Sequence, residues 1–187
     1  MPEKTLYQNV LSTPIGEMYS VYSDDALHLL EFYNAERINK QIKKLNIQPV
    51  QGPAEHPVYK QLIFEIGLYF TGALKEFSIP LNPSGTLFQQ RVWECLRDIP
   101  YGHTISYEAL TNTLGNTNAI RAVAAANGAN PIAILIPCHR VIGKNGALTG
   151  YAGGLNRKRK LLALEKLNSD EKIYQPGDQM ELTPHIR

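Results

Sequence analysis

Residues 130–143 read NPIAILIPCHRVIG, and this stretch determines how the rest of the chain is interpreted. An apolar run leads into Pro137, whose ring fixes the backbone just before Cys138. The thiolate is the nucleophilic form of cysteine, and an unperturbed thiol has a pKa of about 8.5. His139 and Arg140 are therefore candidates for activating Cys138, with a water between thiol and imidazole and a carboxylate that orients the ring. The alternative is a buried, inert cysteine.

The carboxylate has two candidates, because charge is distributed unevenly along the chain. Residues 1–85 hold 7 basic and 9 acidic side chains, whereas residues 86–187 hold 12 and 8. Between Glu108 and Glu165 there is no acid, so these two residues are the nearest candidates. The same span holds seven basic residues: Arg121, Arg140, Lys144, Arg157, Lys158, Arg159 and Lys160. A long run without acids indicates a polyanionic partner, or else a chance run on a solvated face.

The first half has the pattern of a small α+β domain. Residues 5–13, 17–23 and 26–33 alternate between turns, which predicts an antiparallel meander of three strands. Apolar residues at helical spacing predict a helix over 56–71. Residues 79–85, IPLNPSG, break regular structure. We therefore expect one domain at 1–85 and a second at 86–187, with a loosely ordered tail from about residue 168.

The second half is expected to be mostly helical. Residues 88–99 form one predicted helix, with an apolar stripe of Val92, Trp93, Leu96 and Ile99. A short helix runs from Ser106 to Gly115, and Asn116 or Thr117 caps the next one. Two short helices joined by such a turn form a helix-turn-helix. A last helix is predicted over residues 155–167.

The second helix of this pair has an unusual outer face. Its predicted inward residues are Ile120, Val123, Ala124 and Asn127, and its predicted outward residues are Arg121, Ala122, Ala125 and Ala126. A helix that reads bases needs several long polar side chains, and this face has a single Arg. We expect it to bind nucleic acid with little sequence preference. The alternative is an Ala-rich helix buried between its neighbours.

Composition excludes several classes of protein. The two cysteines, Cys95 and Cys138, cannot form a disulfide framework, and the five histidines lack the paired spacing of a zinc site. We expect no metal and no cofactor. No apolar run approaches the length of about 20 residues that spans a bilayer, so we expect no membrane association. Low cysteine content suits a reducing compartment, which predicts a cytoplasmic protein, or a nuclear one in a eukaryotic host.

Several motifs together give the chain a family resemblance. PCHRV at 137–141 is preceded by Asn130-Pro131 and followed by GYAGG at 150–154. Further matches are FQ at 88–89, RVW at 91–93, ISY at 105–107, RAV at 121–123 and LLALE at 161–165. Over about residues 87–166 the chain resembles the O6-alkylguanine-DNA alkyltransferases, above all the stand-alone bacterial type. The resemblance implies a ribonuclease-H-like first domain that supports a helical second domain carrying the chemistry.

The resemblance also implies a role for each matching catalytic residue. Cys138 takes the alkyl group from O6 of guanine irreversibly, so each molecule acts once. His139 matches the residue that deprotonates the thiol through a water, and Glu165 the acid that orients it. Tyr107 matches the hydroxyl that protonates N3 of the leaving guanine, which lowers the barrier to its departure. Asn130 matches a residue that ties the helix-turn-helix to the active-site turn.

Further implied residues concern DNA and the base pocket. Arg121 matches a finger that fills the gap left by the flipped nucleotide, with Ala122, Ala125 and Ala126 on the minor-groove face. We also expect Arg140 at the DNA, and phosphate contacts from residues 157–160. The predicted pocket consists of Val141, Tyr151, Ala152 and Ala133. Many relatives carry Ser at position 152 and some carry Pro at 133, and the second difference alters tolerance of bulky alkyl groups.

The expected function is repair of O6-alkylguanine, and of O4-alkylthymine, in duplex DNA by a monomer. One alternative is a non-catalytic lesion-recognition or signalling protein, which would need an inert residue at 138. A Cys-His hydrolase is the other alternative, but the protease signatures around the cysteine are missing and those enzymes place the His far away in sequence.

Overall fold

The chain forms two compact units, and the computed structural model describes residues 5–115 and 118–169. Residues 1–86 and 131–135 make up the first unit, and residues 87–130 and 136–187 the second. A single boundary at residue 85 would place residues 131–135 in the second domain, whereas they group with the first unit. The predicted caps Asn116 and Thr117, and the predicted tail beyond Ser169, lie outside the described residues.

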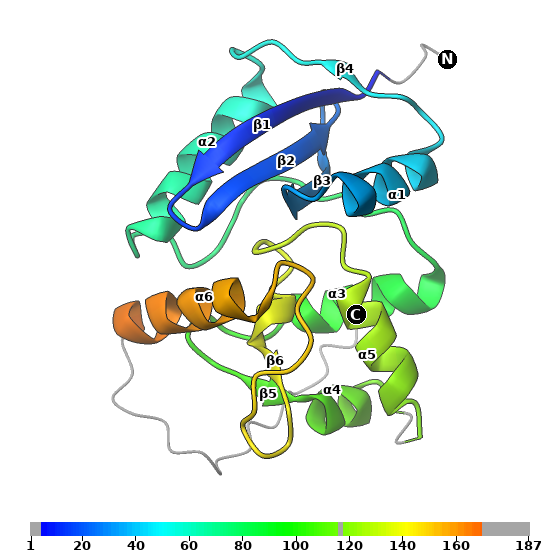
Figure 1. Cartoon of the computed structure of the whole chain (residues 1–187), viewed down its shortest axis with the longest axis vertical. Coiled ribbons are helices and arrows are strands. Elements are labelled where there is room, and N and C mark those ends of the chain that lie inside the picture. Colours follow the sequence, from blue (N-terminus) through cyan, green and yellow to red (C-terminus); the bar gives the residue numbers. More distant parts are fainter. Residues whose placement is uncertain (1–4, 116–117, 170–187) are drawn as a thin grey trace. The chain divides into compact units, whose positions relative to one another are not determined.

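Three strands of the first unit form the predicted antiparallel meander. They are β1 (Tyr7–Thr13), β2 (Gly16–Tyr22) and β3 (Leu27–Phe32). Gly16, with φ of 125°, begins β2 directly after the tight turn from β1. A further strand that the sequence did not predict, β4 (Val50–Gln51), pairs parallel to β1. The sheet order is therefore β3-β2-β1-β4 (Figure 1).

Two helices cover opposite faces of this sheet (Figure 1). Ile42 and Leu45 of α1 (Ala35–Leu45) pack against the cluster that contains Val21. On the other face, Tyr59 of α2 (Pro57–Phe70) stacks on Tyr22, with ring centroids 5.7 Å apart. Consecutive residues of a strand point to opposite faces, so Val21 and Tyr22 report on the two sides. The helix predicted over 56–71 is α2, whereas α1 was not predicted.

Residues 131–135 join the first unit by backbone pairing with β3. Leu30 N donates to Pro131 O at 2.9 Å, and Ala133 N donates to Leu30 O at 2.7 Å. Ile134 then takes φ of 73°, a left-handed conformation that costs a β-branched residue energy. The pairing joins segments far apart in sequence, which is why local patterns do not reveal it.

The second unit is mostly helical, as predicted. Its elements are α3 (Leu87–Arg97), β5 (Ile105–Ser106), α4 (Tyr107–Thr113), α5 (Ile120–Gly128), the 3-10 turn η1 (Cys138–Arg140), β6 (Val141–Ile142) and α6 (Leu155–Asn168). The stripe predicted for the first of these helices is buried. Trp93 on that stripe also donates from Nε1 to Ala126 O at 2.9 Å, which fastens α3 to α5.

Two short strands bring the start of α4 beside the end of η1. β5 pairs parallel to β6, Ile105 with Val141 and Ser106 with Ile142. Ser106, where the sequence predicted this helix to start, is the N-cap of α4, since its Oγ accepts from Ala109 N at 3.0 Å. Tyr107, the first residue of α4, is thereby held near the turn that carries Cys138.

Candidate active site

Cys138 opens η1 at a buried position, with 6% of its surface exposed. Its backbone N–H donates to Ile136 O at 2.8 Å. The side chain of Asn130, just beyond α5, donates from Nδ2 to the same carbonyl at 2.8 Å. The backbone before Cys138 is therefore fixed both by Pro137 and by a side chain from the end of the helix pair. This is the tie between helix pair and turn that the resemblance implies for Asn130.

His139 and Glu165 form a fully buried pair. His139 Nε2 lies 2.7 Å from Glu165 Oε1, and both side chains are 0% exposed. Burial lowers the pKa of His139, against the opposing attraction of Glu165, so the neutral imidazole is favoured. Nδ1 of His139 is buried and has no hydrogen-bond partner among the described residues. One ring nitrogen is thus committed to Glu165, and the other remains available as a base.

Of the two candidate acids, Glu165 lies beside His139 and Glu108 does not. The carboxylate of Glu165 also accepts from Arg140 Nε at 2.9 Å, Arg140 Nη2 at 3.1 Å and Gly102 N at 3.2 Å. Burial alone would raise the pKa of Glu165, but the charges and hydrogen bonds of His139 and Arg140 outweigh it and hold that pKa well below its ordinary value. Glu108 instead forms an exposed pair with Lys144 at 2.9 Å.

Arg140 is a buried residue, whereas the sequence analysis predicted that it contacts DNA. Its side chain is buried, bound to Glu165, and Nη1 donates to Ile99 O at 2.5 Å. The guanidinium also lies over the ring of Tyr101, 5.7 Å from its centroid. A guanidinium that neutralises a buried carboxylate cannot also reach a DNA phosphate. The expected DNA contact from Arg140 is therefore wrong for this structure.

Lys158 corrects a second prediction and adds a residue to the site. It is fully buried, and Nζ donates to Val141 O at 2.6 Å and to Thr149 O at 2.7 Å, so it makes no phosphate contact. Burial lowers the pKa of Lys158, and the nearby charge of Cys138 opposes that effect. A cation within electrostatic reach of the sulfur favours the thiolate. The sequence signal was available, because Lys158, Leu161 and Glu165 share the buried face of α6.

Tyr107 is half-buried and also lies within electrostatic reach of Cys138. Burial, and then the charge of Cys138, raises the pKa of Tyr107, while side-chain hydrogen bonds with Asn127 and Thr149 oppose the rise. Asn127 Nδ2 donates to the Tyr107 hydroxyl at 3.4 Å. The phenol therefore stays protonated at neutral pH and can act as an acid. Sequence reasoning placed Asn127 only on the inward face of its helix and missed this contact.

The outer face of α5 matches the prediction in part. Arg121, Ala122 and Ala125 are exposed, and Val123 is buried. Ala126 is only 3% exposed, so its predicted place on the outer face is wrong, because this part of α5 packs against Trp93. Ile120 is also misplaced by the prediction, since it is 42% exposed at the first position of the helix.

The predicted pocket residues have different surroundings. Val141 is buried on β6, and the ring of Tyr151 stands edge-on to His139 with centroids 6.4 Å apart. Ala152 is exposed. Ala133 belongs to the first unit, so its place in the pocket stays a prediction.

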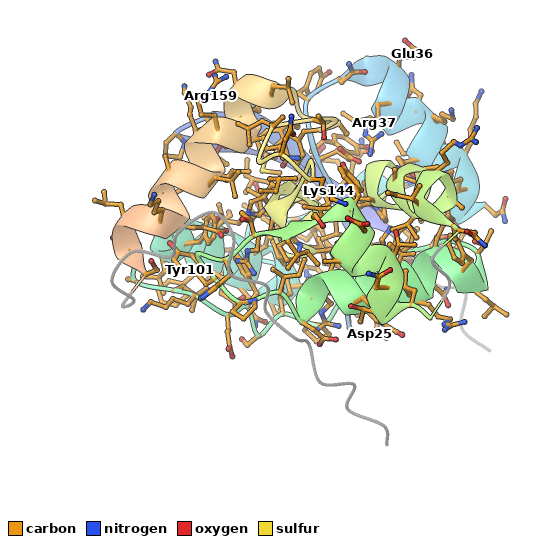
Figure 2. The ribbon with its side chains drawn as sticks, turned by 90° about the horizontal axis from the view of Figure 1, so that it is seen from below. Asp25, Glu36, Arg37, Tyr101, Lys144 and Arg159 are labelled. Carbon is orange, nitrogen blue, oxygen red and sulfur yellow. The ribbon has the colours of Figure 1, made fainter. Side chains whose placement is uncertain are left out.

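Arg159 is the clearest of the predicted phosphate contacts. It projects from α6 and is exposed (Figure 2).

Within residues 5–115 and 118–169, no cluster of three His, Cys, Asp or Glu side chains could hold a metal ion. Over the same ranges, no helix has both the length and the apolar character that a membrane crossing requires.

Comparison with known proteins gives consistent matches over most of the chain. Residues 87–167 match the family model of the 6-O-methylguanine DNA methyltransferase, DNA binding domain. The methylated-DNA–protein-cysteine methyltransferase of Methanosarcina acetivorans is 40% identical over 160 residues, 86% of this chain and 98% of that protein. The crystal structure of Mycobacterium tuberculosis O6-methylguanine methyltransferase has a TM-score of 0.74 at 40% identity, covering 90% of this chain and 97% of that one. M. tuberculosis OGT in complex with DNA has a TM-score of 0.75 at 41% identity, covering 87% and 94%.

Proposed function

The chain belongs to the family of methylated-DNA–protein-cysteine methyltransferases, and from that premise we propose that it repairs O6-alkylguanine in duplex DNA by moving the alkyl group onto its own Cys138. The observation that carries this proposal is a buried Cys138 directly followed by His139, whose Nε2 lies 2.7 Å from Oε1 of the buried Glu165. No sequence-specific reading of DNA is needed, because the lesion itself is recognised.

Activation of the nucleophile begins at His139. Adjacent side chains do not automatically touch, so a water carries the thiol proton from Cys138 to the imidazole. The buried Nδ1 is the acceptor, since Nε2 is bound to Glu165. Glu165 stabilises the imidazolium that forms, and Arg140 and Gly102 keep the carboxylate in place. The buried ammonium of Lys158 adds a positive charge within electrostatic reach of the sulfur.

The transfer is a single in-line displacement. The bond from Sγ to the alkyl carbon forms as the bond from that carbon to O6 breaks, and the electron pair passes to O6 and the guanine ring. Tyr107 gives its proton to N3, so guanine leaves as a neutral molecule. The protons on His139 and Tyr107 then re-equilibrate through water, and the net products are a thioether and guanine. The thioether is not hydrolysed under mild conditions, so each molecule acts once.

The substrate must leave the duplex before Cys138 can reach it. We assign this step to α4 and α5 as a helix-turn-helix that enters the minor groove. Arg121 fills the gap left by the flipped nucleotide, and Ala122 and Ala125 allow close approach; all three are exposed. Main-chain groups around Cys138, Val141 and Ala152 hold the base edge, Tyr151 lines the pocket, and O4-alkylthymine is a second substrate. The protein acts as a monomer.

Intact mass after incubation with a duplex that carries one O6-methylguanine tests the proposal. We expect one added methyl group per chain, which peptide mapping places on Cys138. The variant Cys138→Ser should gain no mass, while Cys95→Ser should react like the wild type, since Cys95 is a half-buried free thiol outside the site. Binding of the lesion without any mass gain would indicate a recognition protein and would overturn the roles of His139 and Glu165.

A further inference from the structure

Asn127 is a buried amide whose polarity the packing of α5 does not require. Its side chain is 2% exposed on the inner face of α5. Nδ2 donates to the Tyr107 hydroxyl, whereas Oδ1 is buried and has no hydrogen-bond partner among the described residues. Burying an amide with one end unpaired is costly, and an apolar side chain would fill the position at lower cost. The hydrogen bond to the Tyr107 hydroxyl is therefore the reason for an amide at this position.

We propose that Asn127 is a positioning residue for Tyr107, which orients the phenol so that its proton points toward N3 of the extruded base. The inference rests on the proposed function, in which Tyr107 protonates the leaving guanine. A hydroxyl oxygen that accepts a hydrogen bond from Nδ2 must turn its own proton away from the amide. His139, Glu165 and Lys158 act on the sulfur. Asn127 acts instead on the leaving group, through its contact with Tyr107.

The same contact also adjusts the acidity of the phenol. Burial makes Tyr107 a weaker acid by raising its pKa, and the hydrogen bond from Asn127 stabilises the phenolate and opposes that rise. An acid that is too weak transfers its proton late and gives less help to the leaving group. Asn127 thus contributes both the direction of the proton and the readiness of the phenol to give it up.

Two nearly isosteric changes have different consequences if this role is correct. Asn127→Leu removes the donor, and we expect the single-turnover rate of alkyl transfer at neutral pH to fall about fivefold, the value of one ordinary hydrogen bond. Asn127→Asp replaces the donor by a carboxylate that accepts the phenol proton, so its loss should be larger. In both variants the alkaline limb of the rate profile, where Tyr107 loses its proton, should move to higher pH.

A double variant separates positioning from a general effect on packing. In a Tyr107→Phe background, Asn127→Leu should slow transfer no further, because the hydroxyl on which it acts is gone. Duplex affinity and thermal unfolding midpoint check that the fold survives. Gln48→Leu, at an exposed amide of the first unit outside the site and the helix pair, is the amide-to-apolar control and should leave rate and profile unchanged.

The outcomes are distinguishable. If Asn127→Leu leaves the pH profile in place and costs as much with Tyr107→Phe as without it, Asn127 has only a structural role and the inference is wrong. If instead the wild-type protein adds no alkyl group to Cys138, the proposed function fails and the inference fails with it.

Discussion

At the scale of single residues, Glu165 holds the site together through its charge. One buried carboxylate accepts hydrogen bonds from His139, Arg140 and the backbone of Gly102. In a medium of low polarity such a charge is stable only while its partners remain. The same bonds that orient the imidazole therefore also stabilise the second unit, so the proposed activity and the stability depend on the same residue.

Glu165→Gln should lower the free energy of unfolding by about 3–5 kcal/mol at neutral pH, because Arg140 stays buried without its countercharge. The pKa of Glu165 is depressed in the folded state, so its charge stabilises the protein fully above the ordinary value of 4.5. That stabilisation is lost as pH falls through the lower, folded-state pKa. Urea unfolding at a series of pH values should show the gap between variant and wild type narrowing below pH of about 4.

Glu108→Gln is the matched control for this experiment. The pair that Glu108 forms with Lys144 is exposed, so its removal should change the unfolding free energy by less than about 1 kcal/mol. A gap between Glu165→Gln and wild type that does not vary with pH would show that the carboxyl is not ionised in the folded protein.

At the scale of elements, α5 connects the face that we propose binds DNA to the candidate site. Its outer side presents Arg121, Ala122 and Ala125, while its inner side carries Asn127 to Tyr107. α3 fixes the helix from behind through the bond from Trp93 to the Ala126 carbonyl. Because α5 is held in this way, a load on the exposed Arg121 need not displace Asn127 and Tyr107 on the inner side.

Arg121→Ala should therefore impair base extrusion and leave the chemistry intact. Unstacking a base costs a few kcal/mol, so we expect the rate on duplex O6-methylguanine to fall by about ten- to a hundredfold. The rate with the free alkylated base should not change. Arg159→Ala, at an exposed arginine of α6 (Figure 2), is the control for loss of charge alone. An unchanged duplex rate together with a slower free-base reaction would contradict the assignment.

The sequence of α1 carries a local helical pattern, although this helix was not predicted. Asn34 caps the helix by accepting from Arg37 N, and Ile38, Ile42 and Leu45 recur at helical spacing. The short strand β4 is different, since its two residues carry no period and exist as a strand only through pairing with β1.

At the scale of the whole molecule, burial changes how the charge distribution must be understood. Of the seven basic residues between Glu108 and Glu165, Arg140 and Lys158 are buried in the site. The remaining five are Arg121, Lys144, Arg157, Arg159 and Lys160, and Lys144 already has Glu108 as a neighbour. Part of the acid-free stretch thus stabilises negative charge inside the protein, and we propose that the exposed part contacts DNA phosphates.

The salt dependence of duplex binding measures how many of these contacts form. Each neutralised phosphate contributes a slope of about −0.9 in a plot of log affinity against log salt concentration. Five contacts at most predict a slope no steeper than about −4.5. Arg159→Ala should make it shallower by about 1. A steeper slope in the wild type would place phosphate contacts outside this group.

The sequence alone determined the meander, the amphipathic α2, the helical second half and the residues of the turn that carries Cys138. These features depend on local periodicity, caps and prolines, which act within a few residues. The family resemblance pointed to Glu165, but tertiary structure showed it beside His139. Tertiary structure also decided that Arg140 and Lys158 are internal partners, that Ala126 is buried, and that residues 131–135 pair with β3. Burial and pairing between distant segments are properties of the packed chain, because a side chain's environment is set by neighbours that the local sequence does not name.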